Sequence, residues 1–142
     1  MTETSTDTST STVRPDIDIH SDLQNLLVHY PPLAHDRHRL TYTVQHGVVT
    51  VAGYLKSRTT YHYLVNNLPL IAGVAAVSHE HLYHDDDIRL EVGRVVPFGV
   101  FANVEYGEVK LTGSLPANVI AEDLAQKIGA VPGVHRVITA LK

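Results

Sequence analysis

The stretch that decides the fold is HGVVTVAG at residues 46–53, which returns as YGEVKLTG at residues 106–113. Each copy begins with a turn residue and a glycine, continues with alternating residues, and ends in a second glycine. Alternation with a period of two is typical of a strand that buries one face. A glycine behind the turn residue favours a tight hairpin with positive φ. We therefore expect the same hairpin twice, sixty residues apart (106 − 46 = 60).

The repeat continues downstream of the hairpin without a gap. Gly73 and Val74 return as Gly133 and Val134, again sixty positions later. Self-similarity at a fixed spacing indicates two copies of one supersecondary unit. We interpret the repeated glycines as turn residues that determine the fold, rather than as ligand contacts. They are Gly47, Gly53, Gly73, Gly107, Gly113 and Gly133.

Upstream of the hairpin the copies correspond at an offset of sixty-nine (88 − 19 = 69). Apolar residues there have the spacing of one helical face. They are Ile19, Leu23, Leu26 and Leu27 in copy one, and Ile88, Val92, Val95 and Val96 in copy two. The difference in offset (69 − 60 = 9) places an insertion at residues 30–38. Its two prolines are expected to end the first helix and to begin an extended loop.

Each copy is expected to run helix, strand, strand, helix, strand. In copy one, Ser57 is a suitable N-cap for the second helix, and the last strand is expected over Val74–Tyr83. In copy two, Asp87 is the expected N-cap of a first helix that starts at Ile88.

The second helix of copy two is expected to open at Ser114 and Pro116, where proline is well tolerated. The last strand follows over Val134–Leu141. The buried stripe of the helix is expected to comprise Val119, Ile120, Leu124 and Ile128.

These patterns predict an α+β fold of two tandem αββαβ modules. Each module is expected to form a small three-stranded mixed sheet with two helices packed on one face, because that arrangement buries every apolar stripe. Module 1 is expected at residues 16–84, with the insertion at 30–38, and module 2 at residues 85–142. The Thr/Ser-rich residues 1–15 are expected to form a disordered tail.

The two glycine-valine signatures resemble the BON (bacterial OsmY and nodulation) domain family. The resemblance rests on residues 46–53 with Gly73–Val77, and on residues 106–113 with Gly133–Val137. It implies a non-catalytic binding role. Similar domains occur in envelope proteins that engage phospholipids, in a cytoplasmic potassium-binding protein, and beside channels and secretion pores. The family has no catalytic residues to carry over.

Composition narrows the function further. The formal net charge is −4 and the basic residues are scattered, which argues against a nucleic-acid binder. Cysteine is absent, which excludes disulfides and thiolate chemistry. No stretch reaches the roughly 18 to 20 apolar residues of a transmembrane helix, and the first residues lack the features of a secretory signal. A cytoplasmic location is therefore expected, with the cell envelope as the alternative.

Two groups of side chains are candidates for binding. His79, His81, His84 and Asp86 could hold a metal such as zinc. The favoured interpretation is an exposed strand end followed by an acidic linker that caps the next helix. His35–His38 is a weaker candidate of the same kind. No fixed cofactor is expected beyond a monovalent or divalent cation.

Tyr54, Tyr61 and Tyr63 suit an interface, since a tyrosine buries an apolar ring and keeps a polar tip. No nucleophile elbow or phosphate loop is present, so we expect no enzyme. The main hypothesis is a non-catalytic protein that binds a small ligand, an ion or a partner protein. A self-assembling scaffold and a phospholipid-binding envelope protein are the alternatives.

Overall fold

The chain forms two compact units. A computed structural model describes residues 13–142, so the expected tail of residues 1–15 lies mostly outside the described residues. One unit ends at His81 and the other begins at Leu82, three residues before the expected boundary. The second unit also takes in Tyr54–Arg58 from within module 1. The predicted α+β fold of two tandem modules is confirmed.

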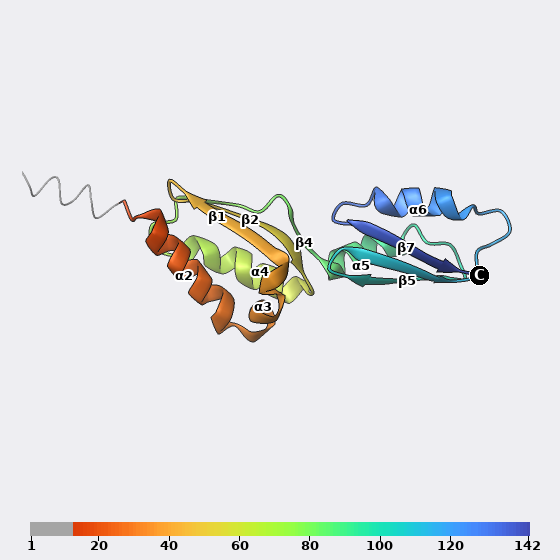
Figure 1. The fold of residues 1–142 in the computed structure, drawn as a ribbon, viewed down its shortest axis with the longest axis horizontal. Coiled ribbons are helices and arrows are strands. Elements are labelled where there is room, and N and C mark those ends of the chain that lie inside the picture. The colour runs from red at the N-terminus through yellow and green to blue at the C-terminus, as the bar shows by residue number, and fades with distance from the viewer. Residues whose placement is uncertain (1–12) are drawn as a thin grey trace, which may run out of the picture. The chain divides into compact units, whose positions relative to one another are not determined.

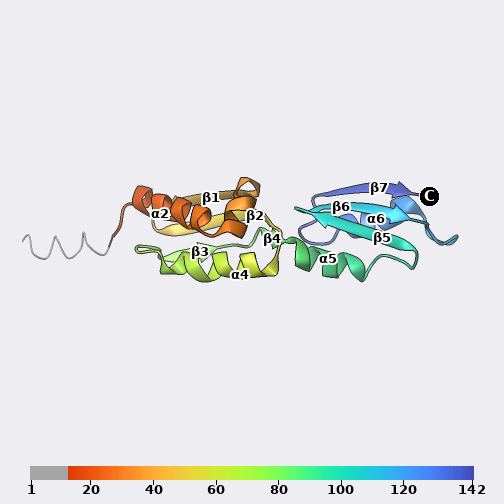
Figure 2. The same ribbon diagram turned by 90° about the horizontal axis from the view of Figure 1, so that it is seen from below.

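Module 1 is built around a mixed sheet. Helix α2 (Asp16–His29) is followed by β1 (Leu40–Gln45), β2 (Val48–Leu55), α4 (Arg58–Asn67) and β3 (Ala76–Ser78). Strand β1 pairs antiparallel with β2, and β2 pairs parallel with β3. Both helices lie on the same face of this sheet (Figures 1 and 2). Its core comprises Ile19, Leu23, Leu27, Leu33, Val49, Val51, Leu64 and Leu68.

The insertion in module 1 is helical. Residues Pro31–Asp36 form α3, and Arg37–Arg39 form the 3-10 turn η1. The expected extended loop is therefore wrong. Proline is tolerated in the first turn of a helix, where its missing N–H has no intrahelical partner, so the two prolines start a helix as well as ending one. Leu33 is fully buried and anchors the inserted turn to the core.

The last strand of module 1 is interrupted. Instead of one strand over Val74–Tyr83, the chain forms β3 and then β4 (Leu82–His84), with a turn between them. The N–H of Gly53 donates to the carbonyl of His81 at 3.0 Å, and β4 pairs with β2. The sheet consequently has four strands where three were expected.

Module 2 repeats the plan. It consists of α5 (Asp85–Gly93), β5 (Val100–Glu105), β6 (Glu108–Gly113), α6 (Ala121–Gly129) and β7 (Arg136–Leu141). Strand β5 pairs antiparallel with β6, which pairs parallel with β7. The core draws on both helices and on one face of the sheet. It comprises Ile88, Val92, Val100, Val104, Val109, Leu111, Leu124 and Ile128.

Both helices of module 2 begin elsewhere than expected. Helix α5 starts at Asp85 rather than Ile88, and its N-cap is His84, whose Nδ1 accepts from the N–H of Asp87 at 3.1 Å. It ends at Gly93, so Val95 and Val96 pack against the core from beyond the helix.

Helix α6 starts at Ala121, not at Ser114 or Pro116. The residues before it form turns, one of which is closed by the N–H of Val119 on the carbonyl of Pro116 at 3.1 Å. Ile120 is the extended N-cap residue and is 63% exposed, so the buried stripe predicted to include it is wrong at this position. The helix buries Leu124 and Ile128.

An aspartate at the start of the first helix holds the hairpin of each module. In module 2 the carboxylate of Asp85 accepts from the N–H groups of Tyr106 and Gly107, at 2.7 and 3.1 Å. In module 1 the carboxylate of Asp16 accepts from His46 and Gly47, at 2.8 and 2.9 Å.

The hairpin turns themselves have positive φ at both central residues, namely 52° and 77° in module 1 and 48° and 79° in module 2. This geometry is that of a type I′ turn, which matches the twist of the flanking strands.

Candidate interaction surfaces

Each sheet keeps one face away from its helices. In module 1 the outward residues of paired strands form the rows Thr41–Ala52, Thr43–Thr50–Ser78 and Gln45–Val48–Ala76. None of these eight side chains is charged. In module 2 the rows are Phe101–Thr112–Ala140, Asn103–Lys110–Ile138 and Glu105–Glu108–Arg136. This face carries two acidic and two basic residues, and is therefore neutral.

Both phenylalanines of the chain lie on the surface of module 2. Phe98 is 98% exposed and Phe101 is 68% exposed. Phe98 is at the tip of a turn closed by the N–H of Val100 on the carbonyl of Pro97 at 3.2 Å, and Phe101 is the outward residue at the start of β5. An exposed aromatic pair of this kind is enriched at protein interfaces. Sequence reasoning missed it, because an aromatic next to a strand is usually a core residue.

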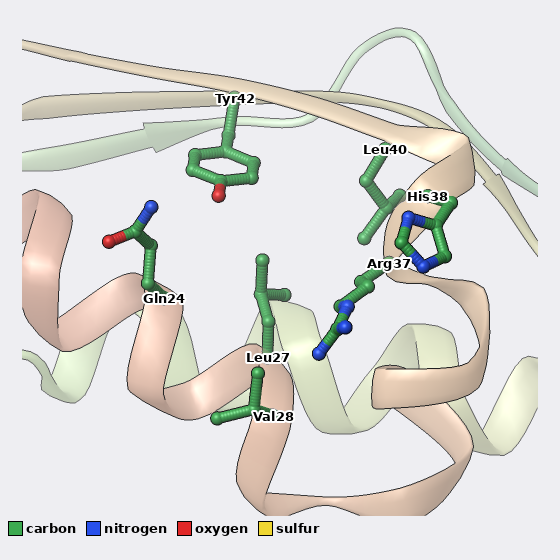
Figure 3. A pocket seen from close by; sticks show the side chains of 7 residues that line it. All are labelled: Gln24, Leu27, Val28, Arg37, His38, Leu40 and Tyr42. Atoms are coloured by element: carbon green, nitrogen blue, oxygen red, sulfur yellow. The ribbon is translucent and has the colours of Figure 1, made fainter.

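Module 1 has a groove between α2 and β1, closed at one end by η1 (Figure 3). Its volume is about 500 Å³, within the range of ligand pockets. Figure 3 shows the ring of Tyr42 reaching down from β1, with the side chain of Gln24 rising toward it from α2. The lining residues are Gln24, Leu27, Val28, Arg37, His38, Leu40 and Tyr42.

The groove combines an apolar floor with polar groups at its rim. Leu27 and Leu40 are buried, whereas Arg37 and His38 are exposed. Within residues 13–142, the guanidinium of Arg37 makes no ion pair. The Tyr42 ring has the ring of His20 as a neighbour at 5.2 Å. This arrangement suits a ligand with an anionic group and an apolar body.

The tyrosines expected to form one interface lie in separate surroundings. Tyr63 stacks on Tyr30, with ring centroids 3.9 Å apart. The hydroxyl of Tyr61 shares a 3.1 Å hydrogen bond with Nδ1 of His79. Tyr54 belongs to the second unit. An interface role for the three remains a prediction, but they do not form a single cluster.

Tyr54 packs closely in the second unit. Its ring lies 5.9 Å from that of Tyr83 and 5.8 Å from that of His135. A Cβ placed on Gly107 would come within 2.3 Å of the Tyr54 ring. Burial raises the pKa of the Tyr54 hydroxyl, and Tyr83 and Asp85 raise it further.

The histidine and aspartate candidates for metal binding are divided between the two units, with His79 and His81 in the first and His84 and Asp86 in the second. Nδ1 of His84 accepts from a backbone N–H. Asp86 accepts from the N–H of Arg58 at 2.9 Å and from Nη1 of Arg89 at 2.9 Å. These hydrogen bonds lower the pKa of Asp86, and the bond from the backbone N–H of Arg58 has the largest effect.

Across residues 13–142, no group of three or more His, Cys, Asp or Glu side chains is arranged to hold a metal ion. This holds for the segment from His35 to His38 as well. In that segment Asp36 is buried, and His38 instead lines the groove.

The six repeated glycines all have positive φ, between 77° and 125°. Gly47, Gly73, Gly107 and Gly133 lie in turns, and Gly113 ends β6. Gly53 was expected to end its strand, but β2 continues to Leu55. In the same described part of the chain, no helix is long and apolar enough to cross a bilayer.

Comparison with known proteins identifies a fold relative. No family model and no curated protein matches the chain. A structure of the C-terminal domain of CdsD, a structural protein of the type III secretion system of Chlamydia trachomatis, superposes with a TM-score of 0.73 at 16% identity. The match covers 91% of this chain and 67% of that one.

A second CdsD structure gives a TM-score of 0.70 at 16% identity, covering 91% of this chain and 63% of that one. The chain thus spans about two thirds of the length of these chains. Either module alone makes up much less than 91% of the chain, so the superposed region includes residues of both modules. At this identity it shows the fold alone.

Proposed function

We propose that the chain is a non-catalytic scaffold protein of two BON-type modules, which self-associates through the outer face of module 2. The observation that carries the proposal is the exposure of Phe101 on that face, together with the exposed Phe98 in the turn that precedes β5. Uncovered aromatic side chains on a sheet with an edge strand favour association, because they bury apolar area that is otherwise hydrated.

The charge on the outer faces favours a second copy of the chain as the partner. The whole chain has a formal charge of −4, yet the outer face of module 2 carries no net charge. Its Glu108 and Arg136 already pair, with 3.5 Å between carboxylate and guanidinium. Two copies can therefore approach through this face without like-charge repulsion.

The likeness to CdsD supports this proposal, since that protein is described as structural and as part of a secretion system. Secretion systems act at the cell envelope, which favours the envelope over the cytoplasm as the location of this chain. The tandem glycine-valine signatures support membership of the BON family.

The test is the association state of the full chain, followed by sedimentation velocity from micromolar to millimolar concentration. We expect a concentration-dependent oligomer. Replacing Phe101 by serine should weaken association at least tenfold, since a buried phenylalanine contributes about 1.5–3 kcal/mol. Ile120→Ser is the matched control, because Ile120 is equally exposed but precedes α6. A chain that stays monomeric throughout, or equal effects of both substitutions, would refute the proposal.

A further inference from the structure

We infer that the groove of module 1 binds the C-terminal tail of a partner protein, in extended form, with a free carboxylate behind an apolar last side chain. Three features carry the inference: the unpaired edge of β1, the direction of that strand, and the polar groups at the closed end. It does not rest on self-association, which concerns module 2.

The first feature is the sheet edge. Strand β1 pairs with β2, and no other strand of the described residues pairs with it. Such an edge presents backbone N–H and C=O groups to an added strand. In Figure 3 the groove lies directly beside this edge, with β1 along one side and α2 along the other. Extended peptides are recognised in this way in several domain families.

The second feature is strand direction. Strand β1 runs from Leu40 to Gln45, so a peptide added antiparallel to it would end beside Leu40. Arg37 and His38 directly precede Leu40 in η1. The terminal carboxylate of such a peptide would lie beside the guanidinium of Arg37. A guanidinium binds a carboxylate through two parallel hydrogen bonds. A parallel peptide would place its ammonium group at the same point, against the positive charge of Arg37.

The third feature is the lining of the groove. Leu40 and Tyr42 are inward-facing residues of β1, so the groove receives every second side chain of an added strand. Leu27 and Leu40 form an apolar floor for the last side chain. The amide of Gln24 and the hydroxyl of Tyr42 (Figure 3) can bond peptide groups of the tail.

The second copy of the repeat lacks these groups. Gln24 corresponds to Gly93 at the upstream offset, and Tyr42 corresponds to Ala102 at the downstream offset. Arg37 and His38 fall in the nine-residue insertion and have no counterpart. Module 2 adopts the same fold without these polar groups. The polar rim of module 1 is therefore not required for folding.

The probe is an N-acetylated hexapeptide of alternating threonine and valine that ends in leucine with a free carboxylate. Its binding to the full chain is followed by amide chemical shifts and by hydrogen exchange. We expect shifts confined to residues 24–45, together with slowed exchange of β1 amides. The same peptide with a C-terminal amide should bind at least tenfold more weakly. Octanoate supplies the carboxylate and an apolar body without a backbone.

The double substitution Arg37→Gln with His38→Gln should weaken binding of the free-acid peptide at least tenfold. Arg94→Gln, an exposed arginine of module 2, should leave it unchanged. Both rim residues are exposed, so the variants should fold, and the melting temperature of each verifies this. Equal binding of acid and amide peptides would overturn the proposal. So would binding of octanoate as tight as that of the peptide, because the site would then take small acids.

Discussion

Replacing Asp85 by alanine removes the carboxylate that joins the first helix of module 2 to its hairpin. Two backbone N–H groups, on Tyr106 and Gly107, lose their acceptor. Asp85 is 2% exposed and Gly107 is buried, so water replaces the lost bonds poorly. A buried donor left without a partner costs about 1–3 kcal/mol.

Because Tyr106 is only half-buried and can be partly rehydrated, we expect a total loss of about 2–4 kcal/mol. For a domain of this size, that loss lowers the melting temperature by roughly 10 to 25 °C. Asparagine at the same position keeps one acceptor oxygen and should cost about half as much.

The assay is thermal unfolding monitored on resolved resonances of each module. Hydrogen exchange of the Tyr106 and Gly107 amides reports on the hairpin itself. Asp87→Ala is the matched control, since Asp87 lies in the same helical turn but is exposed. Asp16→Ala makes the equivalent change in module 1, at a more exposed site, and should have a smaller effect. Equal effects of Asp85→Ala and Asp87→Ala would refute the reasoning.

Three further outcomes are expected. Hydrogen bonds lower the pKa of Asp86 in the folded state, so its ionised form stabilises the fold at pH values above the ordinary carboxyl pKa. This contribution is lost as the pH falls below about 4. Asp86→Asn should therefore make the free energy of unfolding depend less on pH in the acid range. Gly113→Ala should cost at least about 2 kcal/mol, because φ is 96° and the new Cβ would lie 2.2 Å from the carbonyl oxygen of Gly99. Urea titration checks this against Gly129→Ala, whose new Cβ would lie 4.0 Å from Cγ2 of Val137, an ordinary van der Waals contact. Tyr63→Ala should lower the melting temperature more than Tyr61→Phe, since it removes the stacked ring of the Tyr30 pair.

The features that sequence predicted best depend on local pattern alone. The alternation within residues 46–53 and 106–113 is enough to place both hairpins, since strand period and turn chemistry act over a few residues. The glycine pairs made the repeat visible. Asp16 and Asp85 share the upstream offset (85 − 16 = 69), so the repeat also contained the signal for the helix–hairpin bond. The residues before these aspartates, Pro15 and His84, differ, so the neighbouring sequence does not mark the two aspartates as equivalent.

The features that sequence missed depend on tertiary contacts. Nothing local distinguishes Pro31 and Pro32 as helix starters from the same prolines as loop residues. Burial of Leu33 decides the matter, and burial depends on the rest of the module. The expected start of α6 is wrong for a related reason. Ser114 and Pro116 are suited to the start of a helix, but the chain forms a turn after them and the helix begins only at Ala121.

The surfaces proposed for function lie where the two copies differ. Core positions match closely: Val49 and Val109 are both fully buried, as expected if each copy must form the same interior to be stable. Phe101, by contrast, corresponds to Thr41 (101 − 60 = 41), and the rim residues of the groove have no polar counterpart in module 2.

A duplicated module satisfies its folding requirements twice, so outward positions in each copy can change without cost to the core. Phe101 in module 2, and Arg37 and His38 in module 1, lie at exposed positions of this kind. Their differences between the copies fit separate binding roles, an association face on module 2 and a tail-binding groove on module 1. Exchanging Phe101 with Thr41 separates these roles: module 1 of the exchanged chain should keep its peptide affinity, while self-association through module 2 should weaken at least tenfold.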